Sequence, residues 1–191
     1  MVELWRAFGG LIPLFFMITL IVIVSVLLFP KRSVESKKLF LNTLFMLTII
    51  GILLITIFPS RYGQAQPRII NYVPFVGMYD IMFHSVDITV PIRNLGFNIL
   101  LFVPFGFFLS WRKYSYGKLL LNVTLKGLFL SFVIEMFQYI IPMGRSADVD
   151  DLILNTFGAF LGYAIWRMLY NISPNIFGLP NKLKRVKGES F

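Results

Sequence analysis

Hydrophobic residues fall in five long blocks along the chain, separated by polar connections. The first two blocks, residues 8–29 and 39–58, contain no ionisable residue. Each is close to the roughly 20 residues that a helix needs to cross a bilayer. Three further blocks, residues 95–111, 119–141 and 149–170, are also long and apolar but carry a few polar side chains. The pattern predicts an all-α integral membrane protein, a bundle of about five transmembrane helices.

The polar connections divide the chain into four parts. Residues 1–58 form two N-terminal transmembrane helices, and residues 95–170 form a core of three more. Residues 59–94 form an extracytoplasmic loop, and its middle, residues 75–90, is expected to lie in the membrane interface or to re-enter the membrane. Residues 171–191, with prolines, asparagines and a basic cluster, are expected to form a flexible cytoplasmic tail.

Composition narrows the class of protein. The chain is 57% hydrophobic and only 14% charged, whereas a soluble domain carries about 25% charged residues. This excludes a water-soluble globular enzyme. Because cysteine is absent, disulfides, thiolate metal sites and cysteine nucleophiles are excluded as well.

The net charge of +9 is distributed unevenly across the predicted membrane. Five arginines border one side, and twelve lysines and arginines border the other. The positive-inside rule then places the N-terminus outside and the C-terminus in the cytoplasm of a plasma-membrane protein. The expected partners of the basic tail are anionic membrane lipids, at about 1 kcal/mol for each Lys or Arg, and no nucleic acid is needed to explain the charge.

Two ionisable residues lie within the block 119–141, where a buried charge costs roughly 2.5–3.5 kcal/mol. Lys126 is about 10 Å from the cytoplasmic surface, and its long side chain can reach the headgroups. Glu135 is about 9 Å below the opposite surface, and its short side chain must face the protein interior. It shares one helix face with Gly127, Ser131 and Gln138. An interhelical hydrogen bond or a functional site would explain Glu135 and Gln138.

Three acids stand at the start of the last block. Acids in a first turn stabilise a helix N-terminus, but capping needs only one, and Asp148 is the natural candidate. Asp148, Asp151 and Asn155 repeat at a spacing that places them on one face, whereas Asp150 points elsewhere. The role of these residues therefore extends beyond capping.

Two glycines, Gly158 and Gly162, continue this face. Small residues spaced four apart let a neighbouring helix approach closely in a membrane. We expect that neighbour to belong to the same bundle rather than to a second protomer.

The start of one helix, the end of the next and the start of the last meet the same membrane surface. A polar layer is therefore expected there, formed by Asn98, Glu135, Gln138, Asp151 and Asn155, with Asp148 beside it and Arg145 in the turn above. The layer predicts a polar pocket that opens to the outside. Arg145 would bind an anionic group. The amides and Asp148 would orient a ligand, and Glu135 and Asp151 are the candidate acid–base residues.

Other chemistries have less support in the sequence. The sole histidine, His84, lies in a loop, and no nucleophile–base pair is visible. Carboxylates and amides suit a hard cation, but no EF-hand or two-metal spacing is present. The sequence therefore predicts neither a metal nor another cofactor.

Four segments stand out in order along the chain: NYVPF at 71–75, NLGFNILLFVPFG at 94–106, SFVIEMFQ at 131–138 and RSADVDDLILNTFGAFLG at 145–162. Together they resemble the VanZ-like family of membrane proteins. The resemblance covers about half the chain and includes the whole polar layer. It implies an integral plasma-membrane protein that, in the founding case, reduces teicoplanin susceptibility without an established reaction. Pro74, Phe75, Pro104 and Gly106 also match, and turn or kink geometry is expected for them.

Two functions follow from these observations. In the first, the outward pocket binds a cell-wall precursor or another lipid-linked ligand and lowers susceptibility to teicoplanin-type glycopeptides. In the second, the protein is an intramembrane acid–base enzyme in which Glu135 or Asp151 transfers the proton. Transport has less support because five helices show no inverted repeat, and a purely structural role for the polar residues is the simplest alternative.

Overall fold

The computed structural model describes residues 34–57, 70–113, 118–140 and 147–173. Within these ranges four helices are long and apolar enough to cross a membrane. They are α3 (Val34–Ile57), α5 (Thr89–Lys113), α6 (Leu119–Ile140) and α7 (Val149–Ile172). The prediction of an all-α membrane protein is confirmed, and the helix predicted at 8–29 lies outside the described residues.

Two helices begin earlier than hydropathy predicts. α3 starts inside the predicted basic connection, at Val34 rather than residue 39. α5 starts at Thr89 rather than residue 95, because Asp87 accepts the backbone N–H of Thr89 at 2.9 Å. Pro91 follows in the first turn, where a helix needs no N–H donor. The Asp87 cap therefore extends α5 beyond Arg93 and Asn94, the polar residues that interrupt the hydrophobic pattern.

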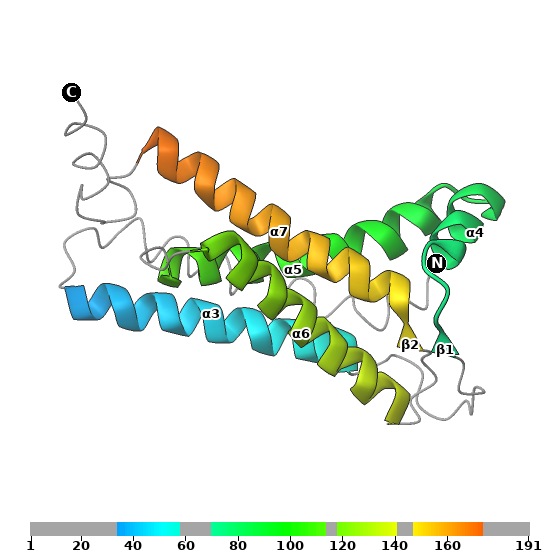
Figure 1. The fold of residues 1–191 in the computed structure, drawn as a ribbon, viewed down its shortest axis with the longest axis horizontal. Coiled ribbons are helices and arrows are strands. Elements are labelled where there is room, and N and C mark those ends of the chain that lie inside the picture. The colour runs from blue at the N-terminus through cyan, green and yellow to red at the C-terminus, as the bar shows by residue number, and fades with distance from the viewer. Residues whose placement is uncertain (1–33, 58–69, 114–117, 141–146, 174–191) are drawn as a thin grey trace.

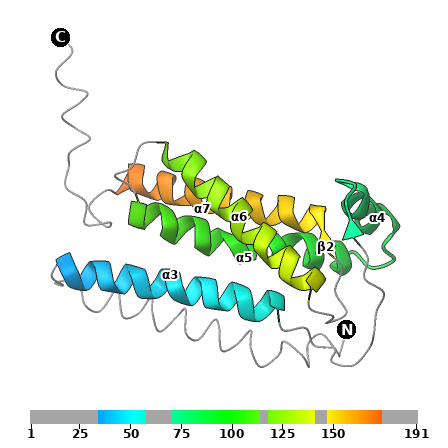
Figure 2. The same ribbon diagram turned by 60° about the horizontal axis from the view of Figure 1, so that its bottom comes forward.

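The helices pack as a three-helix layer with α3 alongside it (Figures 1 and 2). α5 and α7 contact each other most extensively, and α6 packs on α7. α3 contacts both α5 and α6. Buried apolar side chains from all four helices fill the space between them, and the central cluster includes Phe45, Ile52, Phe102, Phe105, Val123, Ile134 and Ala159.

The contact between α5 and α7 is made largely by glycines. A methyl group at Gly106 would collide with the backbone carbonyl of Ala159, and one at Gly158 would collide with that of Ile99. Gly162 meets a carbonyl of α5 in the same way. The three glycines form what we call the glycine seam, and the expected close approach within the bundle is confirmed. Gly106, for which turn or kink geometry was expected, is instead a packing position.

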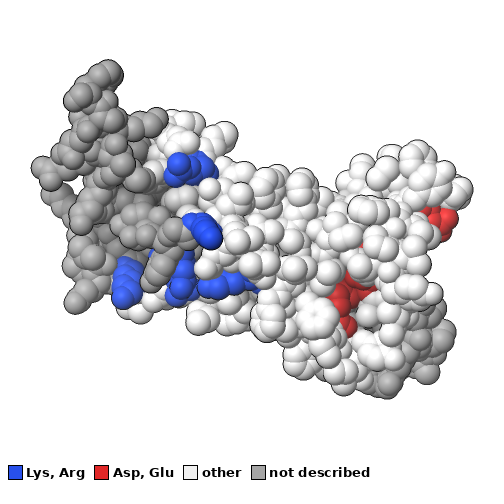
Figure 3. Space-filling view, in the orientation of Figure 1, with Lys and Arg blue, Asp and Glu red and all other residues white. Residues whose placement is uncertain are grey.

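Among the side chains that the structure describes, Lys and Arg gather toward one end of the bundle and Asp and Glu toward the other (Figure 3). By position in the helices, the basic end holds Lys38 of α3, Arg112 and Lys113 of α5, Lys118 and Lys126 at and near the start of α6, and Arg167 of α7. The acidic end holds Asp80, Asp87, Glu135, Asp148, Asp150 and Asp151. Glu35, in the first turn of α3, and Arg93, near the start of α5, are exceptions by position. The acidic end also holds the short helix α4 (Val76–His84) and a two-residue parallel ladder between β1 (Ile70–Asn71) and β2 (Ala147–Asp148). This end contains the candidate site.

Candidate functional site

The ladder brings two distant parts of the chain together at the start of α7. Asn71 lies opposite Asp148 in the register, and its side-chain amide donates to both Asp148 carboxylate oxygens at 3.3 Å. The same carboxylate caps α7, because its Oδ1 accepts the backbone N–H of Asp150 at 2.8 Å. The structure therefore gives Asp148 the capping role that the sequence kept as an alternative.

Glu135 connects α6 to this ladder. The side chain is only 8% exposed, which confirms that it faces the protein interior. Its Oε2 accepts the backbone N–H of Asp148 at 2.9 Å. A charged acceptor makes such a bond stronger than a neutral pair would. Glu135 therefore helps to fix β2, and through it the start of α7.

Asn98 and Asp151 are two predicted site residues whose side chains the structure joins to each other. The Asn98 side-chain amide donates to Asp151 Oδ1, linking α5 to α7 at the acidic end. Both side chains are half-buried, so the pair lies between the packed interior and the surface.

Asn155 lies one helical turn deeper in α7. It is 3% exposed, and its amide nitrogen donates to Ser131 Oγ on α6 at 2.9 Å. Within the described part of the chain, the amide oxygen of Asn155 is buried and accepts no hydrogen bond. Leaving such an oxygen unsatisfied costs about 1–3 kcal/mol. The Asn155 oxygen is therefore available to accept a hydrogen bond from a ligand donor that reaches this depth of the bundle.

Gln138 turns away from the other predicted residues. It is buried, as expected, but its amide nitrogen donates to the Thr56 carbonyl at 3.0 Å. Thr56 is in the last turn of α3, where carbonyls lack partners within the helix. Gln138 therefore makes the interhelical hydrogen bond that the sequence allowed as the simpler explanation.

Asp150 is the residue of this end that the sequence did not select. It is 3% exposed, and its two carboxylate oxygens accept the backbone N–H groups of Phe75 at 2.6 Å and Met78 at 2.8 Å. Phe75 adopts a left-handed conformation with φ of 68°, which agrees with the turn expected there. Gly77 lies beside the carboxylate, where a Cβ would be 3.0 Å from Asp150 Oδ2. Asp150 thus caps α4 from a different helix, and the only sequence signal was a third acid where capping needs one.

Two residues considered in the sequence remain to be placed, Arg145 and His84. Arg145 lies outside the described residues, and its role stays a prediction. His84 is on the surface of α4, where its Nδ1 pairs with Asp80 Oδ1 at 2.8 Å. Among the described residues, no three His, Asp or Glu side chains are grouped as a metal site would require.

The arrangement is rich in hydrogen-bond acceptors. Carboxylates come from α6, β2 and α7, and Asn71 and Asn98 add amides from β1 and α5. Some acidic atoms lie recessed between uncharged side chains at this end (Figure 3). Such a set suits a ligand that offers ammonium, hydroxyl or amide donors.

Comparison with known proteins assigns the chain to a family. The profile of the VanZ/LLP1 family matches residues 45–170, from within α3 to near the end of α7. Protein VanZ of Enterococcus faecium is 34% identical over 74 residues, which cover 39% of this chain and 44% of that protein. No solved structure matches the chain. Because the family match spans most of the chain and every residue of the candidate site, the protein belongs to the VanZ/LLP1 family.

Proposed function

We propose that this protein is a plasma-membrane protein whose acidic end faces the outside of the cell. There it binds a cell-wall precursor or another lipid-linked ligand and so lowers susceptibility to teicoplanin-type glycopeptides. The observation that carries the proposal is the Asn98–Asp151 pair, a half-buried polar contact between two membrane-spanning helices in the acidic half of the bundle. Membership of the VanZ/LLP1 family supports this proposal.

The chemistry of the acidic end favours a ligand with several donors. Asp151 and the unsatisfied oxygen of Asn155 are acceptors at successive depths in α7. Cell-wall precursors carry sugar hydroxyls, peptide amides and ammonium groups that would match them. Arg145, in the preceding turn, would bind an anionic group of the same ligand.

The outward orientation rests on the separation of charge. In the sequence, twelve lysines and arginines border the basic end and five arginines, including Arg93 of α5, border the acidic end, and the positive-inside rule assigns the more basic end to the cytoplasm. The natural absence of cysteine allows a direct test. In intact cells, a membrane-impermeant maleimide should label Asp80→Cys and should label Lys118→Cys only after permeabilisation. The reverse result would overturn the orientation.

The function is tested by growth inhibition with teicoplanin and vancomycin in a sensitive Gram-positive host. The wild-type protein should raise the inhibitory concentration of teicoplanin, and Asp151→Ala and Arg145→Ala should abolish that increase at equal membrane levels. The matched control is Asp80→Ala, which removes an exposed carboxylate from the same end and should leave the increase intact. No shift in the wild type, or an equal shift in all variants, would contradict the proposal.

A second candidate function is acid–base catalysis on a lipid-linked substrate. It is favoured by Asp151, because Asn98 orients a half-buried carboxylate in the first turn of α7. Glu135 is the poorer of the two predicted catalytic residues, because its Oε2 already holds the backbone of Asp148. Mass spectrometry of lipid extracts should show a changed lipid-linked species in cells with the wild type and not with Asp151→Asn. Identical extracts would leave binding as the better account.

A further inference from the structure

We propose that α4 lies in the membrane–water interface at the acidic end, with one face inserted among the lipid headgroups, and that Asp150 of α7 holds it there. The inserted residues are Tyr79, Met82 and Phe83. This role does not depend on the ligand of the acidic end, since it concerns a surface that the bundle leaves uncovered.

The nine residues of α4 divide into three sectors around the helix. The sector that faces the bundle is half-buried and consists of Gly77, Met78 and Ile81. The second sector is exposed and apolar and consists of Val76, Tyr79, Met82 and Phe83. The third is exposed and polar and consists of Asp80 and His84, which pair with each other. A helix that borders protein, lipid and water at once has this arrangement.

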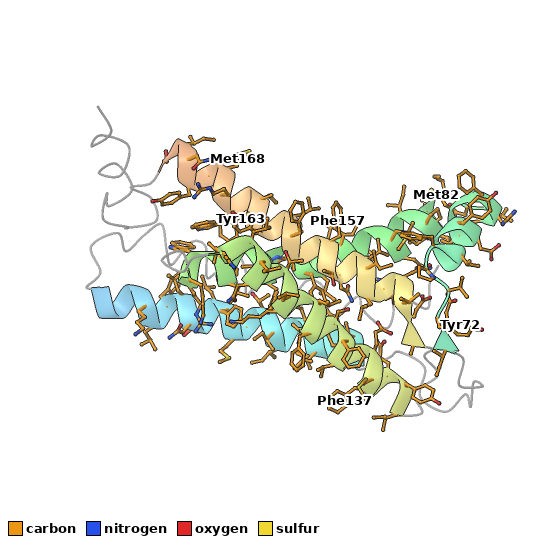
Figure 4. All side chains as sticks on the ribbon, viewed as in Figure 1. Tyr72, Met82, Phe137, Phe157, Tyr163 and Met168 are labelled. Carbon is orange, nitrogen blue, oxygen red and sulfur yellow. The ribbon has the colours of Figure 1, made fainter. Side chains whose placement is uncertain are left out.

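The apolar sector is too exposed for a helix surrounded by water. Tyr79 is 59% exposed and Phe83 is 65% exposed, and their rings contact each other at 4.7 Å between centroids. Met82 also lies on the outer side of α4 (Figure 4). Contiguous exposed apolar surface marks a site of contact with membrane or protein. Aromatic residues are also enriched where membrane meets water.

The length of α5 places α4 at the depth of the headgroups. α5 has 25 residues, about 37 Å at 1.5 Å per residue, which exceeds the roughly 30 Å of the hydrocarbon core. Arg112 and Lys113 hold its C-terminal end among the headgroups of one surface. Its first turn, near Pro91, therefore reaches the opposite boundary. α4 contacts α5 and joins it through residues 85–88, so α4 lies at that boundary.

Lipid is favoured over a protein partner by the surface that follows α4 along the chain. Val86 is fully exposed and Ile88 is largely exposed. Ile92, Phe97 and Leu100 of α5 are exposed as well. The apolar surface of α4 thus leads directly into side chains of a membrane-spanning helix. One continuous environment, the bilayer and its interface, accounts for both.

Asp150 fixes the orientation of this short helix. A nine-residue helix is marginal by itself, and α4 has no side-chain cap of its own. The Asp150 carboxylate supplies two acceptors to its first turn from within the buried start of α7. Because α7 spans the membrane, this contact sets which sector of α4 meets the lipid.

Fluorescence quenching on single cysteines tests the proposal in the full chain. Phe83→Cys and Asp80→Cys would each carry a bimane label, in vesicles of phosphatidylcholine and phosphatidylglycerol. Brominated lipid should quench the label at residue 83 more strongly, and aqueous iodide should quench the label at residue 80 more strongly. Equal access of iodide to both labels would overturn the interfacial position. Protection of residue 83 from both quenchers would overturn it too, because a second copy of the chain would then cover this face.

The role of Asp150 is tested in the same assay. Asp150→Asn should reduce the difference between the two labels, because the amide presents a donor to backbone N–H groups. Gly77→Ala keeps the carboxylate but crowds it, and should reduce the difference to a smaller extent. A difference that stays unchanged in both variants would show that Asp150 does not orient α4.

Discussion

α5 and α7 meet in two different ways along their length. In the middle of the bundle, the glycine seam places backbone against backbone. At the acidic end, the same helices meet through the side chains of Asn98 and Asp151. A close-packed backbone contact tolerates no added volume, whereas a half-buried polar pair can exchange partners. The glycine seam therefore holds α5 and α7 together. This packing does not depend on the Asn98–Asp151 pair, on which the candidate site is built.

Polar groups of the acidic end also divide by the kind of partner they hold. Glu135, Gln138 and Asp150 bond to backbone groups of other segments, and so they maintain the fold. Asn98–Asp151, Asn155–Ser131 and Asn71–Asp148 join side chain to side chain, and Asp148 in addition caps α7. Functional weight is therefore expected on Asp151, Asn98 and Asn155.

The glycine seam can be broken by one side chain. Gly158→Leu should have the largest effect, because its side chain would have to displace the backbone of α5. Overpacking alone costs about 1–3 kcal/mol, and occasionally more. Little monodisperse protein should be recovered in detergent, and what remains should melt at a lower temperature. The matched control is Gly96→Ala, where no atom lies within 4 Å of an added Cβ; recovery of Gly158→Leu at the level of this control would refute the seam.

Loss of the α4 cap should have an intermediate effect. Asp150→Asn removes a charged acceptor of two backbone N–H groups, and hydrogen bonds to charged groups contribute about 1.5–3 kcal/mol. Hydrogen exchange in the peptide 72–84 should accelerate, while exchange in the middle of α5 and α7 should not. Equal acceleration of exchange across the bundle would mean that the acidic end and the glycine seam open together as one cooperative unit.

The contact between α6 and α3 should matter least. Gln138→Leu removes the bond to the Thr56 carbonyl, and such interhelical bonds average about 0.6 kcal/mol in a membrane. The melting temperature in detergent should fall slightly, and teicoplanin susceptibility should not change. If Gln138→Leu had normal stability but lost the teicoplanin phenotype, Gln138 would belong to the binding site and not to the residues that maintain the fold.

Much of this fold could be predicted from hydropathy and helical periodicity. The spans of α6 and α7 agree closely with their apolar blocks, and the buried face that contains Ser131 and Glu135 follows from residue spacing. Residue spacing predicts which side chains share one face of a helix, but it does not predict which other helix that face contacts. Gln138 was therefore expected in the pocket, although a carbonyl of α3 is its partner.

The role of Asp150 could not be predicted for a related reason. Its partners are backbone N–H groups of Phe75 and Met78, which any residue except proline would supply. Only the parallel pairing of β1 with β2 brings these groups beside the start of α7. The start of α5 was missed because Asp87 and Pro91 define it rather than hydrophobicity.

The most direct test of the division between scaffold and site is Asp151→Asn, measured for melting temperature and for teicoplanin susceptibility at equal membrane levels. The substitution keeps the volume of the side chain and an oxygen for the Asn98 amide while it removes the charge. The account predicts a melting temperature close to that of the wild type together with loss of the teicoplanin shift. A variant that unfolds, or one that is stable and retains the full shift, would contradict it.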